Sequence, residues 1–300
     1  MSLFEGLSAF PITPTDVSGR IDTSALRRIL ERIKASGVHS IGLLGSTGAY
    51  PYLTRAERRR AVDCAVETIG GALPVIVGVG ALRTDEAIAL AQDARAAGAD
   101  GLLLAPVSYQ PLRDEEVFAH FQAVTQAGQL PLSIYNNPGT TRFTFSHALI
   151  AQLAQLPHVA AVKMPLPADG DLAGELDAIR AVTPAGFKVG HSGDWGCAEA
   201  LRAGSDTWYS VIAGLMPAET LALAQASQGG DTTRSLALNA AFEPLWALFK
   251  EFGSFRVMYV LAELLGLGTF APPLPILPLG ADVRVRLKAA LESVQTQQLA

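Results

Sequence analysis

One lysine of this sequence, Lys163, is expected at a position where its amine can react with a substrate. Residues 159–165 read Val-Ala-Ala-Val-Lys-Met-Pro, and so short an apolar run predicts a strand buried on both faces of a parallel sheet. Lys163 lies at the end of this strand, where burial disfavours the charged form of an amine. A neutral amine attacks carbonyl carbons, so Lys163 is a candidate nucleophile. The alternative is a structural lysine whose head reaches solvent at the end of the strand.

Other polar side chains follow the other predicted strands. They are Thr13, Ser46, Thr47, Ser108, Tyr109, Tyr135, Asn136, Asn137, His191, Ser192, Asp194, Tyr209 and Ser210, whereas the remaining lysines lie in predicted helices or before the end of a strand. Tyr135 ends the strand before that of Lys163, and neighbouring strands lie about 5 Å apart. We therefore expect the Tyr135 hydroxyl to reach the amine and to move protons while an imine forms.

Short apolar runs alternate with helical patterns along most of the chain. Predicted strands cover residues 7–13, 38–44, 74–79, 100–105, 130–135, 159–165, 187–191 and 207–212, and Thr84 is expected to cap one of the helices between them. Eight alternations spaced about 25 to 30 residues apart favour an α/β fold of the (β/α)8 TIM barrel type. An open doubly wound sheet is the alternative, but the first turn lacks the glycine pattern of a dinucleotide site.

The last part of the chain has only helical patterns. Helices are predicted at 235–251, 254–265 and 282–294, with a proline-rich connection at 271–279. We therefore predict a catalytic (β/α)8 barrel over residues 1–226 and a C-terminal helical domain over residues 227–300.

Composition narrows the class of protein. The chain is 49% hydrophobic and 17% charged, with a formal net charge of −5, which disfavours nucleic acid as a partner. Residues 1–6 lack the features of a signal peptide, and no apolar run is long enough to span a membrane. Cys64 and Cys197 are isolated thiols without the spacing of a metal site or a disulfide framework. A cytoplasmic globular enzyme is expected.

The order of these motifs resembles a known family. Gly-Ser-Thr-Gly at 45–48, Tyr-Asn-Asn-Pro at 135–138, Lys163 and Ser-Gly-Asp at 192–194 are similar, over essentially the whole chain, to the dihydrodipicolinate synthase / N-acetylneuraminate lyase family. The resemblance implies a class I, Schiff-base-forming lyase or aldolase that acts on pyruvate or another 2-oxo acid, without a metal or another cofactor. It also implies a homo-oligomer, a dimer or tetramer.

The resemblance also assigns roles to residues. Lys163 forms the imine, and Tyr135 donates and accepts the proton. Ser46 and Thr47 hold the carboxylate of the 2-oxo acid and relay protons, while Tyr209 matches the position that packs against bound pyruvate.

Three positions depart from the family pattern. Ala49 stands where members usually have glutamate. Ser108 aligns with the tyrosine that reaches across the dimer interface, and the neighbouring Tyr109 is its candidate replacement. Thr140 aligns with the arginine that binds the aldehyde substrate's carboxylate in a true dihydrodipicolinate synthase, and Arg142 follows two residues later. Because a bidentate carboxylate partner is not replaced by a threonine, we expect another substrate in the same chemical class.

Several interpretations remain open. Carbon–carbon cleavage or condensation with pyruvate is the first, and dehydration or deamination of a deoxy-2-oxo sugar acid through the same imine is the second. A true dihydrodipicolinate synthase and a non-catalytic 2-oxo acid binder rank below these. His191 and Asp194 suggest a metal, but no further ligands support one, so no metal site is predicted. The loop at residues 45–48 lacks the Gly-Lys-Ser/Thr ending of a phosphate-binding loop, so nucleotide binding is not predicted.

Overall fold

The computed structural model describes residues 3–16 and 18–298, so residues 1 and 2 of the N-terminal segment considered above lie outside it. Eight parallel strands close into a barrel in sequence order, with β1 pairing both β2 and β8. The strands are β1 (Gly6–Ala9), β2 (Ser40–Leu43), β3 (Val75–Gly78), β4 (Gly101–Leu104), β5 (Leu132–Tyr135), β6 (Val159–Pro165), β7 (Lys188–Ser192) and β8 (Thr207–Ser210). The predicted TIM barrel is confirmed.

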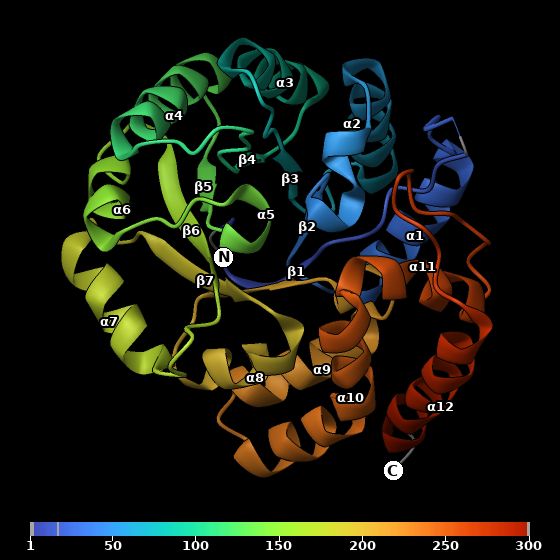
Figure 1. Cartoon of the computed structure of the whole chain (residues 1–300). Helices are drawn as coiled ribbons and strands as arrows, with labels where there is room; N and C mark the ends of the chain where they lie inside the picture. The colour runs from blue at the N-terminus through green and yellow to red at the C-terminus, as the bar shows by residue number, and fades with distance from the viewer. Residues whose placement is uncertain (1–2, 17, 299–300) are drawn as a thin grey trace.

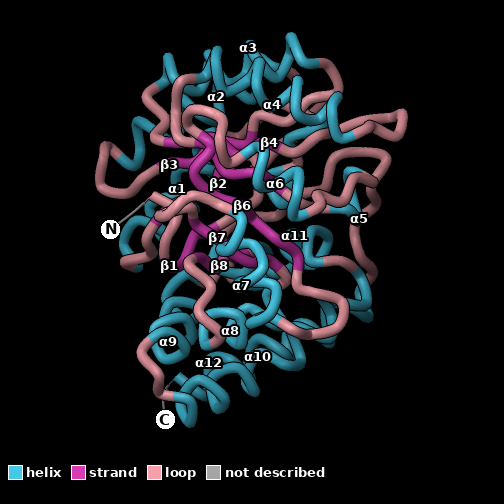
Figure 2. The backbone as a smooth tube through the Cα atoms, turned by 90° about the vertical axis from the view of Figure 1, so that its left-hand side faces the viewer, coloured by secondary structure: helices cyan, strands magenta, loops and turns pink. Residues whose placement is uncertain are grey.

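Helices surround the barrel (Figure 1). They are α1 (Thr23–Ser36), α2 (Arg55–Ile69), α3 (Thr84–Ala97), α4 (Asp114–Gly128), α5 (Pro138–Thr141), α6 (His147–Leu153), α7 (Leu172–Val182), α8 (Asp194–Arg202) and α9 (Pro217–Gln228), with short 3₁₀ turns η1 (Ser46–Gly48), η2 (Tyr50–Tyr52) and η3 (Ile212–Gly214). The C-terminal helices α10 (Thr232–Phe252), α11 (Ser254–Leu264) and α12 (Ala281–Gln298) follow. Helix α10 packs on α8, α9 and α12, so these four helices lie together on one side of the barrel (Figure 2). None of the helices in the described ranges is both long and apolar enough to span a membrane.

Local sequence explains where the elements begin and end. Asp22 caps α1, because its carboxylate accepts a hydrogen bond from the Ala25 backbone N–H at 2.9 Å. Gly37 ends the same helix with φ +85°, a conformation that favours glycine. The buried face of α1 has the three- and four-residue spacing of an amphipathic helix. Asp171 caps α7 in the same way.

Some predicted boundaries differ from the structure. Strand β6 has the predicted bounds, Val159–Pro165, with Lys163 two residues before its carboxyl end, whereas β1 ends at Ala9, before the predicted Thr13. Thr84 is not a cap: α3 begins at Thr84 itself, and the Thr84 hydroxyl pairs with His120 Nδ1 at 3.0 Å. A tertiary contact replaces the local hydrogen bond that the sequence suggested.

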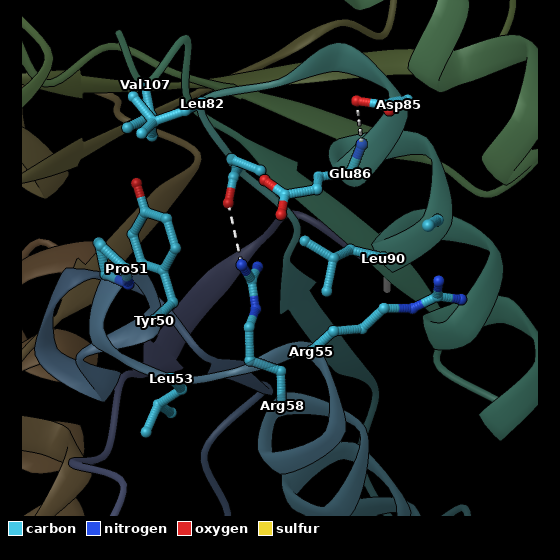
Figure 3. A pocket seen from close by; sticks show the side chains of 13 residues that line it. Tyr50, Pro51, Leu53, Arg55, Arg58, Leu82, Asp85, Glu86, Leu90 and Val107 are labelled. Atoms are coloured by element: carbon cyan, nitrogen blue, oxygen red, sulfur yellow. Dashed lines mark hydrogen bonds between the residues drawn. The ribbon is translucent and has the colours of Figure 1, made fainter. Parts of the chain in front are cut away.

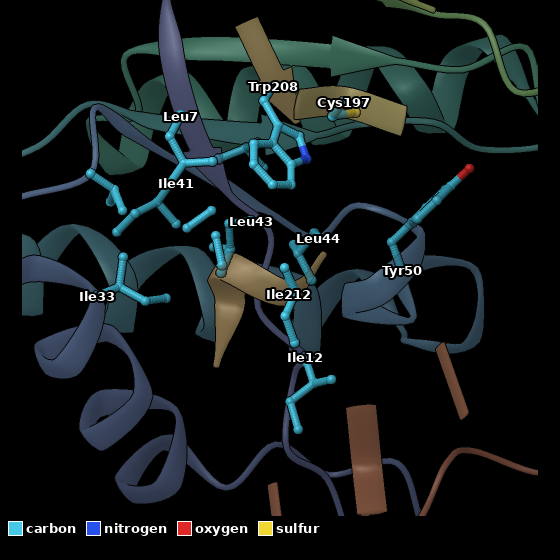
Figure 4. Close-up of a cluster of buried hydrophobic side chains, with 14 of the residues drawn as sticks. Leu7, Ile12, Ile33, Ile41, Leu43, Leu44, Tyr50, Cys197, Trp208 and Ile212 are labelled. Carbon is cyan, nitrogen blue, oxygen red and sulfur yellow. The ribbon is translucent and has the colours of Figure 1, made fainter. Parts of the chain in front are cut away.

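The hydrophobic core has two parts. The larger one lies between the strands and the surrounding helices, and Leu7, Ile41 and Trp208 belong to it (Figure 4). The smaller one comprises Phe4, Phe10, Ile76, Leu103, Ala105, Tyr135, Ala161 and Tyr209. Members of the smaller cluster alternate along their strands with members of the larger one, as expected for side chains that point into the barrel. Lys163, two residues after Ala161 on β6, points the same way.

Candidate active site

Lys163 lies at the centre of the site. Its neighbours in register are Tyr135 on β5 and Gly190 on β7. The lysine is only 4% exposed, and its Nζ atom lies 4.1 Å from the ring centroid of Phe10 and 4.3 Å from that of Tyr135. The Tyr209 ring is 5.6 Å away. None of the ion pairs among the described residues involves Nζ, and the groups packed closest around it are aromatic rings.

The Tyr135 hydroxyl belongs to a short hydrogen-bonded chain. It lies 3.1 Å from Ser46 Oγ and accepts a hydrogen bond from Asn137 Nδ2 at 2.9 Å. Ser46 is the first residue of η1, directly after the loop that leaves β2, and Asn137 precedes α5. Thr47 is buried beside Ser46. The structure therefore brings Lys163, Tyr135 and Ser46 together, as the sequence predicted, and adds Asn137.

Tyr209 forms one wall of the site. Its ring meets the edge of the Phe10 ring at a centroid distance of 6.0 Å and an interplanar angle of 84°. Its hydroxyl lies 3.4 Å from Ser133 Oγ, inside the barrel. Burial raises the pKa of Tyr209 to about 12. Tyr209 thus contributes an apolar face and a protonated hydroxyl at ordinary pH.

Two predicted binding residues lie farther from this hydrogen-bonded chain. Ser108 is half-buried in the loop after β4, and the neighbouring Tyr109 is 87% exposed. Thr140 is exposed and donates to the carbonyl of Asn137 within its own turn. Arg142 ends α5 with φ +56° and is also exposed. Within one chain, none of these side chains forms a hydrogen bond with Tyr135 or Ser46.

His191 and Asp194 have structural partners. His191 lies between Glu175 (Nε2 to Oε2, 2.9 Å) and Ser205 (Nδ1 to Oγ, 3.0 Å). Asp194 accepts hydrogen bonds from Trp208 Nε1 at 2.7 Å and from the backbone N–H of Ile212 at 3.0 Å. Burial raises the pKa of the Asp194 carboxyl above its usual value. In the part of the chain that the structure describes, no group of three or more His, Cys, Asp or Glu residues is arranged to hold a metal ion.

A separate cavity of about 440 Å³ lies between α2 and α3 (Figure 3). Arg58 lines it, and its buried guanidinium donates to the carbonyls of Gly78 and Gly80 at 2.8 and 3.0 Å. Burial lowers the pKa of Arg58 to about 10. Tyr50 lines the cavity beside Arg58, with its ring centroid 5.3 Å from the guanidinium carbon. Lys163 does not line this cavity.

Sequence reasoning missed Phe10 and the role of Asn137. An aromatic residue directly after a strand has no feature that separates it from an ordinary core residue. The available signal was Gly42, because a glycine inside a strand often marks the close approach of another group. Asn137 was noted as a polar residue after β5 and as part of the Tyr-Asn-Asn-Pro motif, but no role was assigned to it.

This arrangement has a definite chemical capacity. A buried amine can attack a carbonyl carbon, and an adjacent phenol can transfer the protons that imine formation requires. The barrel places both groups at the carboxyl ends of neighbouring strands, where enzymes of this fold carry their active sites. Fold and site define a class I, Schiff-base-forming lyase.

Comparison with known proteins identifies the family. A model described as the dihydrodipicolinate synthetase family matches residues 3–294. A 4-hydroxy-tetrahydrodipicolinate synthase from Salinibacter ruber is 33% identical over 298 residues, which is 97% of this chain and 96% of that protein. The chain belongs to the dihydrodipicolinate synthetase family.

Solved structures agree with this assignment. The dihydrodipicolinate synthase from Agrobacterium tumefaciens str. C58 is 56% identical, with a TM-score of 0.96 over 97% of this chain and 98% of that one. The chloride inhibited dihydrodipicolinate synthase from Acinetobacter baumannii, solved in complex with pyruvate, is 27% identical, with a TM-score of 0.88 over 97% of this chain and 99% of that one.

Proposed function

We propose that Lys163 forms an imine with pyruvate or another 2-oxo acid, and that the enzyme then makes or breaks a carbon–carbon bond. The observation that carries this proposal is the position of Nζ, buried at 4.3 Å from the ring of Tyr135, whose hydroxyl is itself bonded to Ser46 and Asn137. A relative from Acinetobacter baumannii was solved with pyruvate, which supports this substrate class.

The chemistry requires several proton transfers. The neutral amine adds to the carbonyl carbon and gives a carbinolamine, whose hydroxyl leaves as water once it has been protonated. Tyr135 is the proposed donor and acceptor of these protons, and Ser46 passes protons to and from the Tyr135 hydroxyl. Loss of a C3 proton then gives an enamine, the carbon nucleophile for condensation. Cleavage is the reverse sequence and releases the 2-oxo acid and an aldehyde.

The carboxylate of the 2-oxo acid is assigned to the turn after β2. Ser46 and Thr47 begin η1 there, and the Thr47 hydroxyl and the backbone N–H groups of these two residues are the proposed donors, because the N–H groups of Gly48 and Ala49 already donate to the carbonyls of Gly45 and Ser46. Ala49, where the family usually has glutamate, is buried with φ +56° and ends η1. Its methyl group leaves the carboxylate site without an adjacent negative charge.

A second candidate reaction is dehydration or deamination of a deoxy-2-oxo acid through the same imine. Thr140 stands where a true dihydrodipicolinate synthase has arginine, and its hydroxyl is bonded within its own turn. Arg142 is exposed at the end of α5. The site therefore lacks an arginine that could bind a second substrate carboxylate with two hydrogen bonds. This favours a substrate that has no second carboxylate.

We also propose that the enzyme is a homo-oligomer that acts in the cytoplasm. Tyr52, Leu82 and Tyr109 are large apolar side chains exposed at 45%, 64% and 87%. Light scattering coupled to gel filtration tests the assembly, and a monomer at micromolar concentration would contradict it. Cell fractionation tests the location.

Borohydride trapping tests the imine. Borohydride delivers hydride to the imine carbon and converts the C=N bond into a stable secondary amine on the lysine. We expect incubation with pyruvate and borohydride to label Lys163, as mapped by mass spectrometry, and Lys163→Ala to remain unlabelled. Lys188→Ala is the matched control, because Lys188 is a half-buried lysine of the same barrel that is paired with Glu5 and Asp206. Absence of an adduct with pyruvate and with longer 2-oxo acids would refute the proposal.

Product analysis separates the two reactions. An aldolase releases pyruvate and an aldehyde, whereas a dehydratase or deaminase keeps the carbon chain whole. Substrates labelled with ¹³C at C1, followed by NMR, distinguish these outcomes.

A further inference from the structure

Asn137 makes a hydrogen bond to Tyr135 that the proposed proton transfers do not use. It lies between β5 and α5, where its carbonyl accepts hydrogen bonds from the backbone N–H groups of Thr140 and Thr141, both at 3.0 Å. The side chain does not cap α5. Instead, its Nδ2 atom donates to the Tyr135 hydroxyl at 2.9 Å. The backbone of Asn137 thus anchors the turn, and its side chain contacts the residue that is proposed to move protons.

The chemistry of the two groups fixes the direction of this hydrogen bond. An amide nitrogen can only donate, so the Tyr135 oxygen is the acceptor. The single proton of the phenol therefore cannot point toward Asn137. It is left for Ser46 Oγ, 3.1 Å away, or for a substrate attached to Lys163, whose Nζ atom lies 4.3 Å from the centroid of the Tyr135 ring. Asn137 thus keeps this proton on the side of the reacting groups.

The same hydrogen bond stabilises Tyr135 once its proton has left. When Tyr135 protonates the carbinolamine hydroxyl, the nitrogen lone pair forms the C=N bond, water leaves with the electron pair of the C–O bond, and the Tyr135 oxygen becomes a phenolate. A hydrogen bond to a charged oxygen is about twice as strong as one between neutral groups. Tyr135 is only 6% exposed, so water contributes little to this stabilisation. The Asn137 donor is in place before the charge forms, as in an oxyanion hole.

We propose that Asn137 is a positioning residue for proton transfer at Tyr135. It directs the phenol proton toward Ser46 and the substrate, and it stabilises the phenolate that remains after the proton has been donated. The inference rests on the proposed imine chemistry of Lys163 and adds to it a residue that acts through Tyr135. Loss of the Asn137 donor should therefore lower kcat and leave the KM for pyruvate nearly unchanged.

Asn137→Asp tests the direction of the hydrogen bond. A carboxylate has the shape of the amide but only accepts, so Tyr135 would donate its proton to residue 137 and lose a donor at its oxygen. Asparagine and aspartate are equally suited to the residue before a helix, so α5 should remain intact. We expect kcat for exchange of the pyruvate C3 protons in D₂O, followed by NMR, to fall at least about 100-fold, because a positioned proton donor and acceptor contributes about 10²- to 10⁴-fold.

Asn137→Leu tests the donor without adding a charge. Leucine has nearly the size of asparagine but offers no hydrogen bond. We expect kcat for exchange to fall about tenfold, which corresponds to the loss of one hydrogen bond to a charged group. Borohydride labelling of Lys163 at saturating pyruvate should persist in both variants, because the amine and its surroundings are unchanged.

Asn239 provides the matched control. It is another half-buried asparagine, and its side chain donates to Glu243 at 3.1 Å and accepts from Trp246 Nε1 at 3.1 Å on α10. Asn239→Asp and Asn239→Leu make the same two exchanges away from Tyr135, so both should exchange the pyruvate protons at the wild-type rate. Circular dichroism checks folding, and Asn137→Ala replaces a variant of Asn137 that does not fold.

The outcomes separate the two proposals. Wild-type kcat in the folded Asn137→Leu variant overturns the role of the donor, and wild-type kcat in Asn137→Asp shows that Tyr135 donates to this position instead. A rise in KM at constant kcat also overturns the inference, because Asn137 would then bind the substrate directly. If the wild type shows neither a borohydride adduct nor exchange of the pyruvate protons, the proposed function itself fails.

Discussion

Replacing Tyr135 with phenylalanine removes one hydroxyl and leaves the ring beside Lys163 in place. The hydroxyl has two partners, Ser46 Oγ at 3.1 Å and Asn137 Nδ2 at 2.9 Å. Each hydrogen bond contributes about 0.5–1.5 kcal/mol to stability. Ser46 and Asn137 are half-buried, so water can take the place of the lost oxygen. We therefore expect the free energy of unfolding to fall by only about 1 kcal/mol.

The effect on catalysis should be larger than the effect on stability. A positioned proton donor and acceptor accelerates a reaction by about 10²- to 10⁴-fold. The loss of the hydroxyl should therefore raise the barrier by about 2.7–5.5 kcal/mol, which exceeds the cost in stability. The Tyr135→Phe enzyme is expected to be folded and nearly inactive.

Exchange of the C3 protons of pyruvate for deuterium is the most direct assay. The exchange requires the imine and the enamine but no second substrate, so NMR in D₂O measures it while the acceptor is unidentified. Tyr259→Phe is the matched control, because it removes another buried tyrosine hydroxyl, one that forms no hydrogen bond with the residues that the structure describes. Exchange at the wild-type rate in Tyr135→Phe would show that another group moves the proton.

Three further perturbations test other contacts. Ser46→Ala removes one hydrogen bond of the Tyr135 hydroxyl and should slow deuterium exchange about tenfold, measured by the same NMR assay, while borohydride labelling persists. Asp194→Ala leaves three N–H donors without their acceptor and should lower the free energy of unfolding in urea by about 3 kcal/mol, whereas no change would show that water replaces the carboxylate. The hydrogen bonds from Arg55 hold the pKa of Asp93 below 3.8. The stabilisation from this half-exposed pair is present above pH 3.8 and is lost as the pH falls through the lowered pKa, so Asp93→Asn should reduce the difference in unfolding midpoint between pH 7 and pH 3.

The fold could be predicted because the signals of strands and helices are local and repeated. Short apolar runs, helix caps such as Asp22, and glycines such as Gly37 mark each unit without reference to the rest of the chain. The short elements η1 and α5 could not be predicted, because three or four residues carry no periodicity. Thr84 was misassigned because its hydroxyl pairs with a histidine on the next helix.

The site could be predicted in part. Neighbouring strands of a parallel sheet bring residues at similar heights together, so Tyr135 and Lys163 could be paired from the sequence alone. Contacts across the seam where β1 pairs with β8 could not be predicted, because they depend on the positions of aromatic rings inside the barrel. Phe10 approaches Lys163 only because Gly42 and Gly45 lack side chains. The residues around Phe10 in the sequence do not indicate that this space is available next to another strand.

The pairing of β1 with β8 also affects how the chain folds during synthesis. Gly6 pairs with Thr207 and Ala9 with Ser210, so the barrel can close only after β8, which is synthesised about 200 residues after β1, has been made. Until then both edges of the growing sheet are open to other chains, and folding is slow because contacts so distant in sequence must form. Phe10 and Tyr209 lie on opposite sides of this seam. Until β8 has joined β1 the pocket around Lys163 lacks one wall, so the imine chemistry proposed for this lysine requires the closed barrel.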